Sequence, residues 1–112
     1  MATQRSTVDF ILEQTAGAGD VSARAMFGEY GFYCDGKILG LICDDTLFLK
    51  YTPGAAALIP DADMGPPYTG AKPHLIADGL LDDPDSFVPL LRAIWDDVPQ
   101  PKPKAPRKRK GG

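Results

Sequence analysis

The sequence predicts a single small α+β domain followed by a detached, strongly basic tail. Short apolar runs separated by turn pairs occupy residues 30–51, which is typical of antiparallel strands. Apolar residues at spacings of three and four occupy residues 87–98, which indicates an amphipathic helix. Residues 99–112 contain six of the twelve basic side chains and none of the acidic ones. We therefore expect a folded domain over residues 1–98 and a disordered Pro/Lys/Arg tail over residues 99–112.

The first part of the chain predicts one helix and one strand. Ser6 or Thr7 can cap the helix, Asp9 lies near its positive end, and Gly17 closes it. Its apolar face is predicted to hold Val8, Ile11, Leu12 and Thr15. After the loop signal of residues 16–20, residues 21–27 can extend as a first strand.

A meander of three antiparallel strands is predicted at residues 30–34, 37–43 and 46–51. The pair Asp35-Gly36 is a strong hairpin signal, because a type I′ turn needs positive φ at both central residues. If both turns have two residues, the opposed pairs are Tyr33 and Ile38, Gly31 and Gly40, Ile42 and Leu47, and Gly40 and Leu49.

This register makes both faces of the sheet apolar. One face is predicted to carry Tyr33, Ile38, Ile42, Leu47, Leu49 and Tyr51. The other is predicted to carry Tyr30, Phe32, Leu39, Leu41 and Phe48. An exposed antiparallel sheet normally alternates apolar and polar residues, so we expect helices on one face. Loops, the tail or a second copy would cover at least part of the other face. The paired glycines indicate either a hollow that a helix can approach or a β-bulge.

Residues 53–77 predict a short helix, a long connection and one more strand. Pro53-Gly54 opens a helix over residues 55–59 that stops at Pro60. Residues 61–73 are rich in Pro, Gly and Asp and predict an irregular connection. Residues 73–77 can return as an edge strand, since an edge tolerates the missing amide donor of Pro73.

The last helix has a broad apolar stripe and proline boundaries. The stripe consists of Phe87, Leu90, Leu91, Ile94, Trp95 and Val98. With Asp85 or Ser86 as the N-cap, Pro89 falls in the first turn, where a missing amide hydrogen costs little. Pro99 and Pro101 end the helix.

The net charge of −3 conceals a division between the domain and the tail. The domain carries six basic and fifteen acidic side chains, a net charge of −9, and the tail carries +6. The tail cations are Lys102, Lys104, Arg107, Lys108, Arg109 and Lys110. They can neutralise phosphates and so give salt-sensitive affinity for nucleic acid, with little sequence specificity. Alternatively, the tail folds back on the acidic domain, against Asp96 and Asp97.

No motif for catalysis, metal binding or membrane insertion stands out. Cys34 and Cys43 have no metal-ligand or redox spacing, so we expect two buried thiols, with a disulfide as the alternative. His74 fits an edge strand better than a catalytic centre. Turn or cap contexts account for Asp63, Asp82, Asp83 and Asp85. We therefore expect a non-enzymatic protein without a cofactor or metal. No apolar run approaches the roughly 20 residues of a membrane helix, and no secretory signal is evident, so we expect a cytoplasmic protein.

The run from Arg24 to Lys37, followed by Leu47-Phe-Leu-Lys50, resembles the N-terminal domain of the TfoX/Sxy family. The residues that carry the resemblance are Arg24, Met26, Phe27, Gly28, Tyr30, Gly31, Tyr33, Asp35, Gly36 and Lys50. The resemblance extends over residues 8–98 and implies a two-layer domain similar to secretion-chaperone-like folds, with helices packed on a twisted antiparallel sheet. Glu29 stands where the family commonly has a second glycine.

The resemblance also implies a regulatory function. Full-length TfoX proteins regulate natural competence with a cyclic-AMP receptor type of transcription activator, and they carry a second, C-terminal domain. In this sequence the short basic tail stands in its place. We therefore expect a module that binds a protein partner, such as a transcription activator, and contacts nucleic acid through its tail. The alternative is a stand-alone adaptor or a homodimer with no nucleic-acid role, since both faces of the predicted sheet are apolar. A binding surface would use Met26, Phe27, Gly28, Tyr30 and Phe32, for which core packing is the other interpretation.

Overall fold

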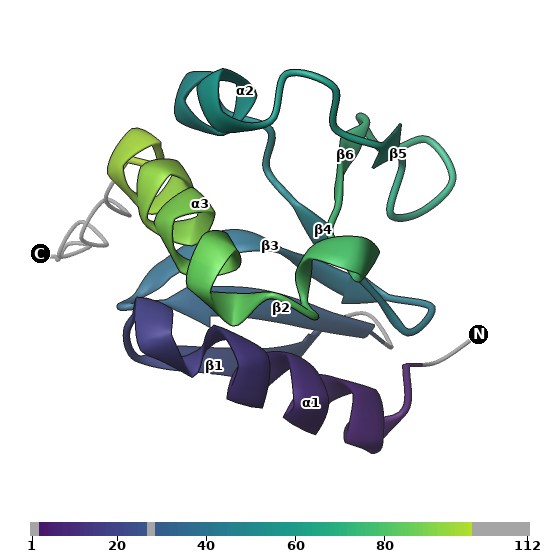
Figure 1. Cartoon of the computed structure of the whole chain (residues 1–112). Helices are drawn as coiled ribbons and strands as arrows, with labels where there is room; N and C mark the ends of the chain where they lie inside the picture. The colour runs from purple at the N-terminus through teal and green to yellow at the C-terminus, as the bar shows by residue number, and fades with distance from the viewer. Residues whose placement is uncertain (1–2, 27–28, 100–112) are drawn as a thin grey trace, which may run out of the picture.

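The computed structural model describes residues 3–26 and 29–99, which form two layers (Figure 1). The described residues contain three α-helices, α1 (Arg5–Thr15), α2 (Pro53–Leu58) and α3 (Pro84–Asp97), and one antiparallel sheet of six strands. Helices α1 and α3 lie on the same face of the sheet. The predicted α+β class is confirmed. In this part of the chain no helix is long and apolar enough to cross a membrane.

The strands follow one another across the sheet almost in chain order. They are β1 (Val21–Met26), β2 (Glu29–Cys34), β3 (Lys37–Cys43), β4 (Thr46–Leu49), β5 (Met64–Gly65) and β6 (His74–Ile76). The order across the sheet is β1-β2-β3-β4-β6-β5. The predicted meander is confirmed, although its last strand ends at Leu49 and not at Tyr51. The strand predicted within residues 73–77 is confirmed as β6, but its predicted position at the edge of the sheet was wrong, because the two-residue β5 pairs with the far side of β6.

A register shift between β2 and β3 changes the pairing of the two glycines. The shift falls between Phe32 and Tyr33, so Gly40 lies opposite Phe32 and Gly31 lies opposite Leu41. The other three predicted pairs are confirmed: Tyr33 with Ile38, Ile42 with Leu47, and Gly40 with Leu49. A bulge of this kind inserts one extra residue in one strand and reverses the alternation of side chains beyond it. Of the two interpretations of the glycines, the structure therefore selects the bulge.

The bulge also corrects the predicted faces of the sheet. The face beneath α1 and α3 buries Phe32, Leu39, Ile42, Leu47 and Leu49 completely. The opposite face, here called the open sheet face, carries Arg24, Tyr33, Ile38, Leu41 and Phe48. The prediction had placed Phe32 and Leu39 away from the core and Tyr33 and Ile38 within it. It was wrong because it assumed an unbroken alternation through Leu39 and Gly40.

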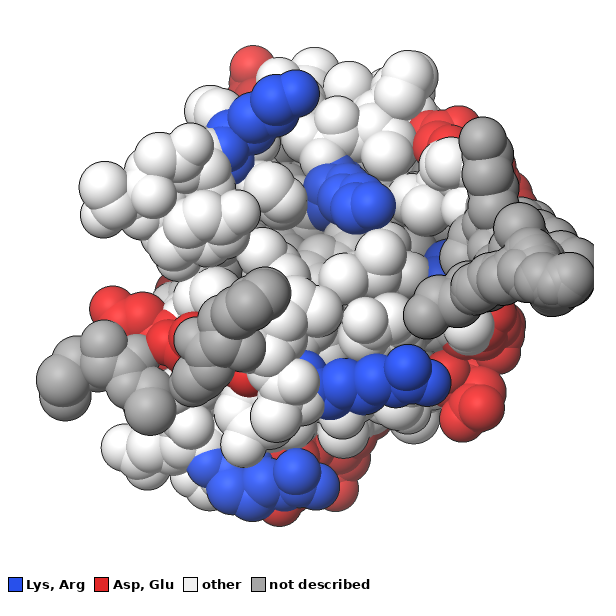
Figure 2. Space-filling model, turned by 180° about the vertical axis from the view of Figure 1, so that it is seen from behind, with Lys and Arg blue, Asp and Glu red and all other residues white. Residues whose placement is uncertain are grey.

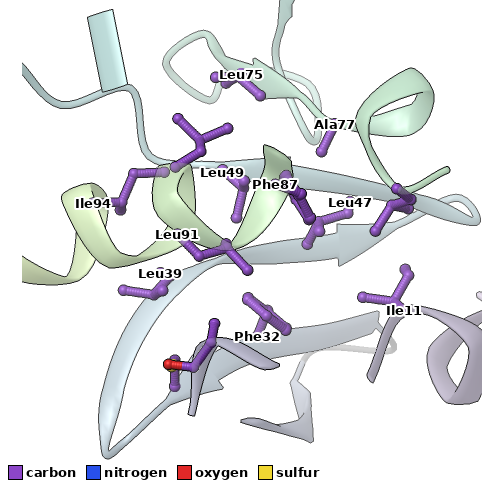
Figure 3. Packing of buried hydrophobic residues seen from close by; sticks show 14 of the residues in the cluster. Ile11, Phe32, Leu39, Leu47, Leu49, Leu75, Ala77, Phe87, Leu91 and Ile94 are labelled. Carbon is purple, nitrogen blue, oxygen red and sulfur yellow. The ribbon is translucent and has the colours of Figure 1, made fainter. Parts of the chain in front are cut away.

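The hydrophobic core lies between the helices and the sheet (Figure 3). Helix α3 contributes the fully or almost fully buried Phe87, Leu90, Leu91 and Ile94. Helix α1 contributes Val8, Ile11 and Thr15. Both predicted apolar faces are confirmed, although Leu12 and Trp95 are only partly buried. Since each large apolar side chain stabilises the fold by roughly 1.5–3 kcal/mol when fully buried, this cluster is the main source of stability.

Helix α1 begins earlier than predicted and is fastened by a distant carboxylate. Its N-cap position is Gln4, and no side chain caps it in the usual way. Instead, one carboxylate oxygen of Asp45 accepts hydrogen bonds from the Gln4 amide at 2.8 Å and from the Thr7 hydroxyl at 2.9 Å. The prediction of Ser6 or Thr7 as the cap was therefore wrong.

Helix α3 also begins earlier than predicted, at Pro84. Proline suits the first helical position because its missing N–H would be unpaired there in any case. Asp85 and Ser86 consequently lie within the first turn. The prediction that Pro89 falls in the first turn was wrong, because Pro89 lies inside the helix. The Phe87 amide already bonds to the Asp83 carbonyl at 3.0 Å, so Pro89 removes one hydrogen bond from an established helical ladder.

The connection over residues 61–73 covers part of the open sheet face. It contains β5 and buries Pro67, while Tyr68 remains 60% exposed. Pro67 and Tyr68 face Leu41 and Cys43 of β3 across a hollow. Loops, the tail or a second copy were expected to cover this face, and the structure shows a loop over one part of it.

Candidate functional site

The β2–β3 turn fastens the sheet to α3 through the Asp-Gly motif. Asp35 and Gly36 have φ values of +46° and +85°, as a type I′ turn requires. One Asp35 carboxylate oxygen accepts a hydrogen bond from the Asp20 amide at 2.8 Å. The other lies 3.0 Å from the Arg92 guanidinium. The Asp20 hydrogen bond, followed by the one from Arg92, lowers the pKa of Asp35 below its ordinary value. Asp35 is therefore engaged in holding the fold.

Two cations enclose the indole ring of Trp95 near the end of α3. Lys37 Nζ lies 3.6 Å from the ring centroid, and the Arg92 guanidinium carbon lies 4.6 Å from it. Lys37, only 6% exposed, also donates a hydrogen bond to the Trp95 carbonyl at 2.8 Å. The indole N–H donates to the Cys34 carbonyl at 2.9 Å. A cation at a helix C-terminus is favoured by the helix dipole, so this group of residues fixes the end of α3 from which the tail departs.

Glu29, at the start of β2, links the N-terminal segment to the β3–β4 turn. Its carboxylate accepts hydrogen bonds from the Thr3 amide at 2.9 Å, from the Thr3 hydroxyl, and from the Asp44 amide at 3.1 Å. Burial raises the pKa of Glu29, but these hydrogen bonds together lower it below the ordinary value. Glu29 is therefore a carboxylate at neutral pH. Its place in the sequence, where a glycine is common in the family, gives this chain an anion at that point.

The motif residue Gly31 allows two large side chains to lie flat on the open sheet face. A Cβ at Gly31 would lie 3.0 Å from the Tyr33 ring and 3.1 Å from the Met26 methyl group. Glycine is thus needed for this close approach rather than for an unusual φ. The Arg24 guanidinium lies over the Tyr33 ring, 5.0 Å from its centroid. Figure 2 shows the surface from behind, with mainly uncharged atoms in the middle, separate Lys and Arg side chains among them, and Asp and Glu at the margins.

A hollow of about 710 Å³ opens beside this surface and is here called the sheet-face hollow. Its lining residues come from the facing ends of β1 and β2, from β3 and its turn to β4, and from the connection before β6. They are Met26, Glu29, Tyr30, Leu41, Cys43, Asp44, Pro67, Tyr68 and Thr69. Its size lies within the range of sites for small ligands or peptide side chains. The lining combines apolar and aromatic walls with two carboxylates, and such a site suits an occupant that has an apolar surface and a positive charge.

The two cysteines are free and buried, as predicted. Burial raises the pKa of both thiols, and the carboxylates of Glu29 and Asp44 raise that of Cys43 further. Both thiols therefore stay protonated at neutral pH, which is the form that does not act as a nucleophile or metal ligand. Across residues 3–26 and 29–99, no group of three or more His, Cys, Asp or Glu side chains is placed to hold a metal ion.

The motif residues lie in several separate parts of the structure. Asp35 and Gly36 form the turn against α3, and Arg24, Met26, Gly31 and Tyr33 lie on the open sheet face. Tyr30 and Met26 line the sheet-face hollow. Lys50 follows β4 and is half-buried. Phe27 and Gly28 lie outside the described residues, as do the six tail cations predicted to bind nucleic acid. His74, predicted to be structural, has Nδ1 2.8 Å from the Lys72 carbonyl oxygen.

Sequence reasoning did not predict the hollow itself. Its walls join Leu41 and Cys43 of the meander to Pro67 and Tyr68, which are more than twenty residues away along the chain. The one available signal was a large aromatic residue, Tyr68, within a connection otherwise rich in Pro, Gly and Asp.

Comparisons with known proteins agree with the sequence motif and this architecture. Residues 13–98 match the TfoX N-terminal domain family. Over all 112 residues the chain is 34% identical to a protein of Spirochaeta aurantia described as an uncharacterized 12.7 kDa protein in the trpE 5′ region, and the match covers 97% of that protein. The matched segment includes both the Asp-Gly turn and every strand of the sheet. The chain belongs to the TfoX N-terminal domain family.

Proposed function

We propose that this chain is a non-enzymatic, cytoplasmic regulatory module that binds a protein partner at the sheet-face hollow and contacts nucleic acid through the cations of residues 102–110. The observation that carries the proposal is the hollow, with apolar walls on a sheet face that the helices leave open. Aromatic residues and Met are enriched in the cores of protein interfaces. Tyr68, 60% exposed beside the hollow, has the accessible area that a partner would bury.

Binding rather than catalysis is supported by the state of the reactive side chains in and near this face. Cys43 is buried and protonated, and the Glu29 carboxylate is already held by Thr3 and Asp44. Asp35 and Lys37 are engaged with α3. A lowered pKa activates a thiol as a nucleophile, whereas the pKa of Cys43 is raised.

Membership of the TfoX N-terminal domain family supports a transcription activator as the protein partner and a role in transcription regulation such as competence. The tail would then add affinity for nearby phosphates, since six cations occur in fourteen residues without an acidic side chain.

Protein capture from the native cell tests the role of the hollow. The full chain, a Tyr68→Ala variant and a Phe10→Ala variant are compared side by side. Phe10 is a matched control because it is 45% exposed and lies on α1, in the other layer. We expect a partner that is retained by the full chain and by Phe10→Ala but lost with Tyr68→Ala. Equal capture of every protein by all three chains would contradict the proposal.

Titration of duplex DNA over a salt series tests the tail. In the tested variant, the last four tail cations, Arg107, Lys108, Arg109 and Lys110, are replaced by Gln, and the chain keeps its full length. If each cation meets one phosphate, the slope of log K against log salt should fall in magnitude by about 3.6, at about 0.9 per phosphate. The control replaces Arg5 and Lys72 in the domain. An unchanged slope in the tail variant would remove the nucleic-acid role.

Self-association is a second candidate, favoured by the exposed edge of the sheet. Strand β1 has a strand partner on one side only among the described residues, and its six residues could pair with the same strand of another copy. Light scattering over a range of concentrations tests this candidate. A mass that stays monomeric at the highest concentration would contradict it.

A further inference from the structure

Two carboxylates of the sheet-face hollow have no basic side chain paired with them in the described part of the chain. Within residues 3–26 and 29–99 the acidic members of the ion pairs are Asp9 and Asp35, so Glu29 and Asp44 of the hollow are not among them. Burial raises the pKa of the Cys43 thiol, and both carboxylates raise it further, so the two charges act on the same wall of the hollow. Residues 1–98 as a whole carry six basic and fifteen acidic side chains. The hollow therefore attracts a positively charged group.

The two carboxylates differ in the hydrogen bonds that they can still accept. Glu29 already accepts two hydrogen bonds from Thr3 and one from the Asp44 amide, which occupy most of its lone pairs. Asp44 uses its backbone, since its amide donates to Glu29 and its carbonyl accepts from the Thr46 hydroxyl at 3.3 Å. Asp44 is exposed, and its carboxylate can accept two parallel N–H groups from one planar donor. Glu29 thus supplies mainly charge, and Asp44 supplies charge and acceptors.

The Tyr68 ring provides a flat and accessible wall. On the same face of the sheet, the Arg24 guanidinium lies over the Tyr33 ring, 5.0 Å from its centroid. Among the described residues no cation lies over Tyr68 in this way, and Tyr68 is 60% exposed. A guanidinium stacks on an aromatic face because it is planar and weakly hydrated, whereas the ammonium of lysine is compact and strongly hydrated. The ring therefore favours arginine over lysine.

The apolar part of the lining suits the rest of an arginine side chain. Met26, Leu41 and Pro67 provide apolar surface beside Tyr68. Arginine packs its methylene groups along such a surface while its charged end reaches polar groups. Arginine is also one of the residue types that contribute most to binding when they are buried at the centre of an interface.

We propose that the sheet-face hollow binds an arginine side chain of the protein partner, with the guanidinium against Tyr68 and Asp44 and the methylene groups along Leu41. The inference rests on the proposed function only where it assigns this arginine to a protein. It gives the partner a definite chemistry, because a neutral side chain would leave the charge of the hollow unpaired and a lysine could not stack on the ring.

Peptide titration of the isotope-labelled full chain, followed through its amide signals in NMR spectra, tests this assignment. Three capped tripeptides are compared: Ala-Arg-Ala and the same sequence with citrulline or lysine in the middle. Citrulline has nearly the shape of arginine without its charge, and lysine has the charge without the plane. We expect the arginine peptide to shift the amide signals of Leu41, Cys43 and Tyr68. It should bind about 5-fold more tightly than the lysine peptide and about 10-fold more tightly than the citrulline peptide.

Two charge variants locate the guanidinium. Asp44→Asn removes the charge but keeps the turn, because Asn, like Asp, tolerates the positive φ of +52° at this position. It should weaken binding of the arginine peptide by about 10-fold and change that of the citrulline peptide by less than about 2-fold. Asp82→Asn is the matched control, since it removes the same charge from an exposed position outside the hollow. It should leave both affinities unchanged.

Four results would overturn the inference. The first is equal binding of the three peptides, and the second is equal weakening by Asp44→Asn and Asp82→Asn, which would identify general attraction to the acidic domain. The third is a set of shifted signals that lies outside the hollow. The fourth is a shift of the same hollow signals when the concentration of the chain alone is raised, because the occupant would then be a second copy.

The protein-capture experiment fails or succeeds independently of these titrations. A partner lost with Tyr68→Ala, together with equal binding of the three peptides, would keep the hollow as a protein site and refute the arginine alone. Selective binding of the arginine peptide without any captured partner would keep the arginine site and refute the partner.

Discussion

The β-bulge and the close contact of β3 with β4 predict that Gly40→Ala strongly destabilises the domain. Gly40 is buried between Phe32 of β2 and Leu49 of β4. A Cβ added there would overlap the carbonyl oxygen of Phe48 and lie 3.0 Å from the Cα of Leu49. These are backbone atoms of the neighbouring strand, so no side-chain rotation can relieve the overlap.

The expected effect is large relative to the stability of a small domain. Inserting an extra methyl group into a packed interior typically costs about 1–3 kcal/mol. Since the strands themselves must separate here, we expect the upper end, about 3 kcal/mol out of a total of roughly 5–15 kcal/mol. At about 4–8 °C per kcal/mol, the melting temperature should fall by about 12–24 °C.

Urea unfolding followed by the fluorescence of Trp95, the single tryptophan, measures this loss. The matched control is Gly79→Ala, because a Cβ at Gly79 meets no atom within 4 Å and its φ is ordinary. We expect the control to change the free energy of unfolding by less than about 0.5 kcal/mol. If Gly40→Ala proved as mild as the control, the register of β3 against β4 and the position of the bulge would both be refuted.

Three further predictions concern the contacts between the sheet and α3 and the buried thiols. Lys37→Met removes a hydrogen bond to the Trp95 carbonyl and a cation over its ring, so the free energy of unfolding in urea should fall by about 1–3 kcal/mol. The native fluorescence emission of the indole should also shift, and an unchanged spectrum would contradict the contact. The folded pKa of Asp35 is lowered from 3.8, first by a backbone amide hydrogen bond and then by a guanidinium, so its stabilising effect is present above about pH 3.8 and is lost as pH falls through the folded value. The difference in unfolding free energy between wild type and Asp35→Asn should therefore shrink in acid, and a difference that grew would reverse the assigned sign. Cys34 and Cys43 should react with a thiol reagent at pH 8 at least about 100-fold more slowly in the native protein than in denaturant, because both are buried with raised pKa values; rapid reaction of either native thiol would disprove its burial.

Local patterns in the sequence were sufficient to predict most of the fold. The pair Asp35-Gly36 predicted a hairpin because its backbone requirement is met by the two residues themselves, and the structure has that turn with both φ values positive. The stripe from Phe87 to Ile94 predicted the buried face of α3 because helical periodicity is a property of a single segment. The motif around Arg24 likewise predicted the family.

Features that depend on two distant segments were decided only by the tertiary structure. Asp45 replaces Ser6 and Thr7 in fastening the start of α1, since the helix and the β3–β4 turn meet in space and not in sequence. Pro89 lies inside α3 because Pro84 already begins the helix.

The candidate site shows the same division most clearly. The apolar character of the open sheet face could be predicted from the meander, but the residues assigned to it were partly wrong because a one-residue bulge near Gly40 exchanged the faces. The hollow could not be predicted, because its walls bring Tyr68 of a long connection beside Leu41 and Glu29. By itself the sequence determined the family, the order of the elements and the basic character of the tail. The register, the exposed face and the hollow were decided by packing, because each depends on contacts between segments that are separate in the sequence.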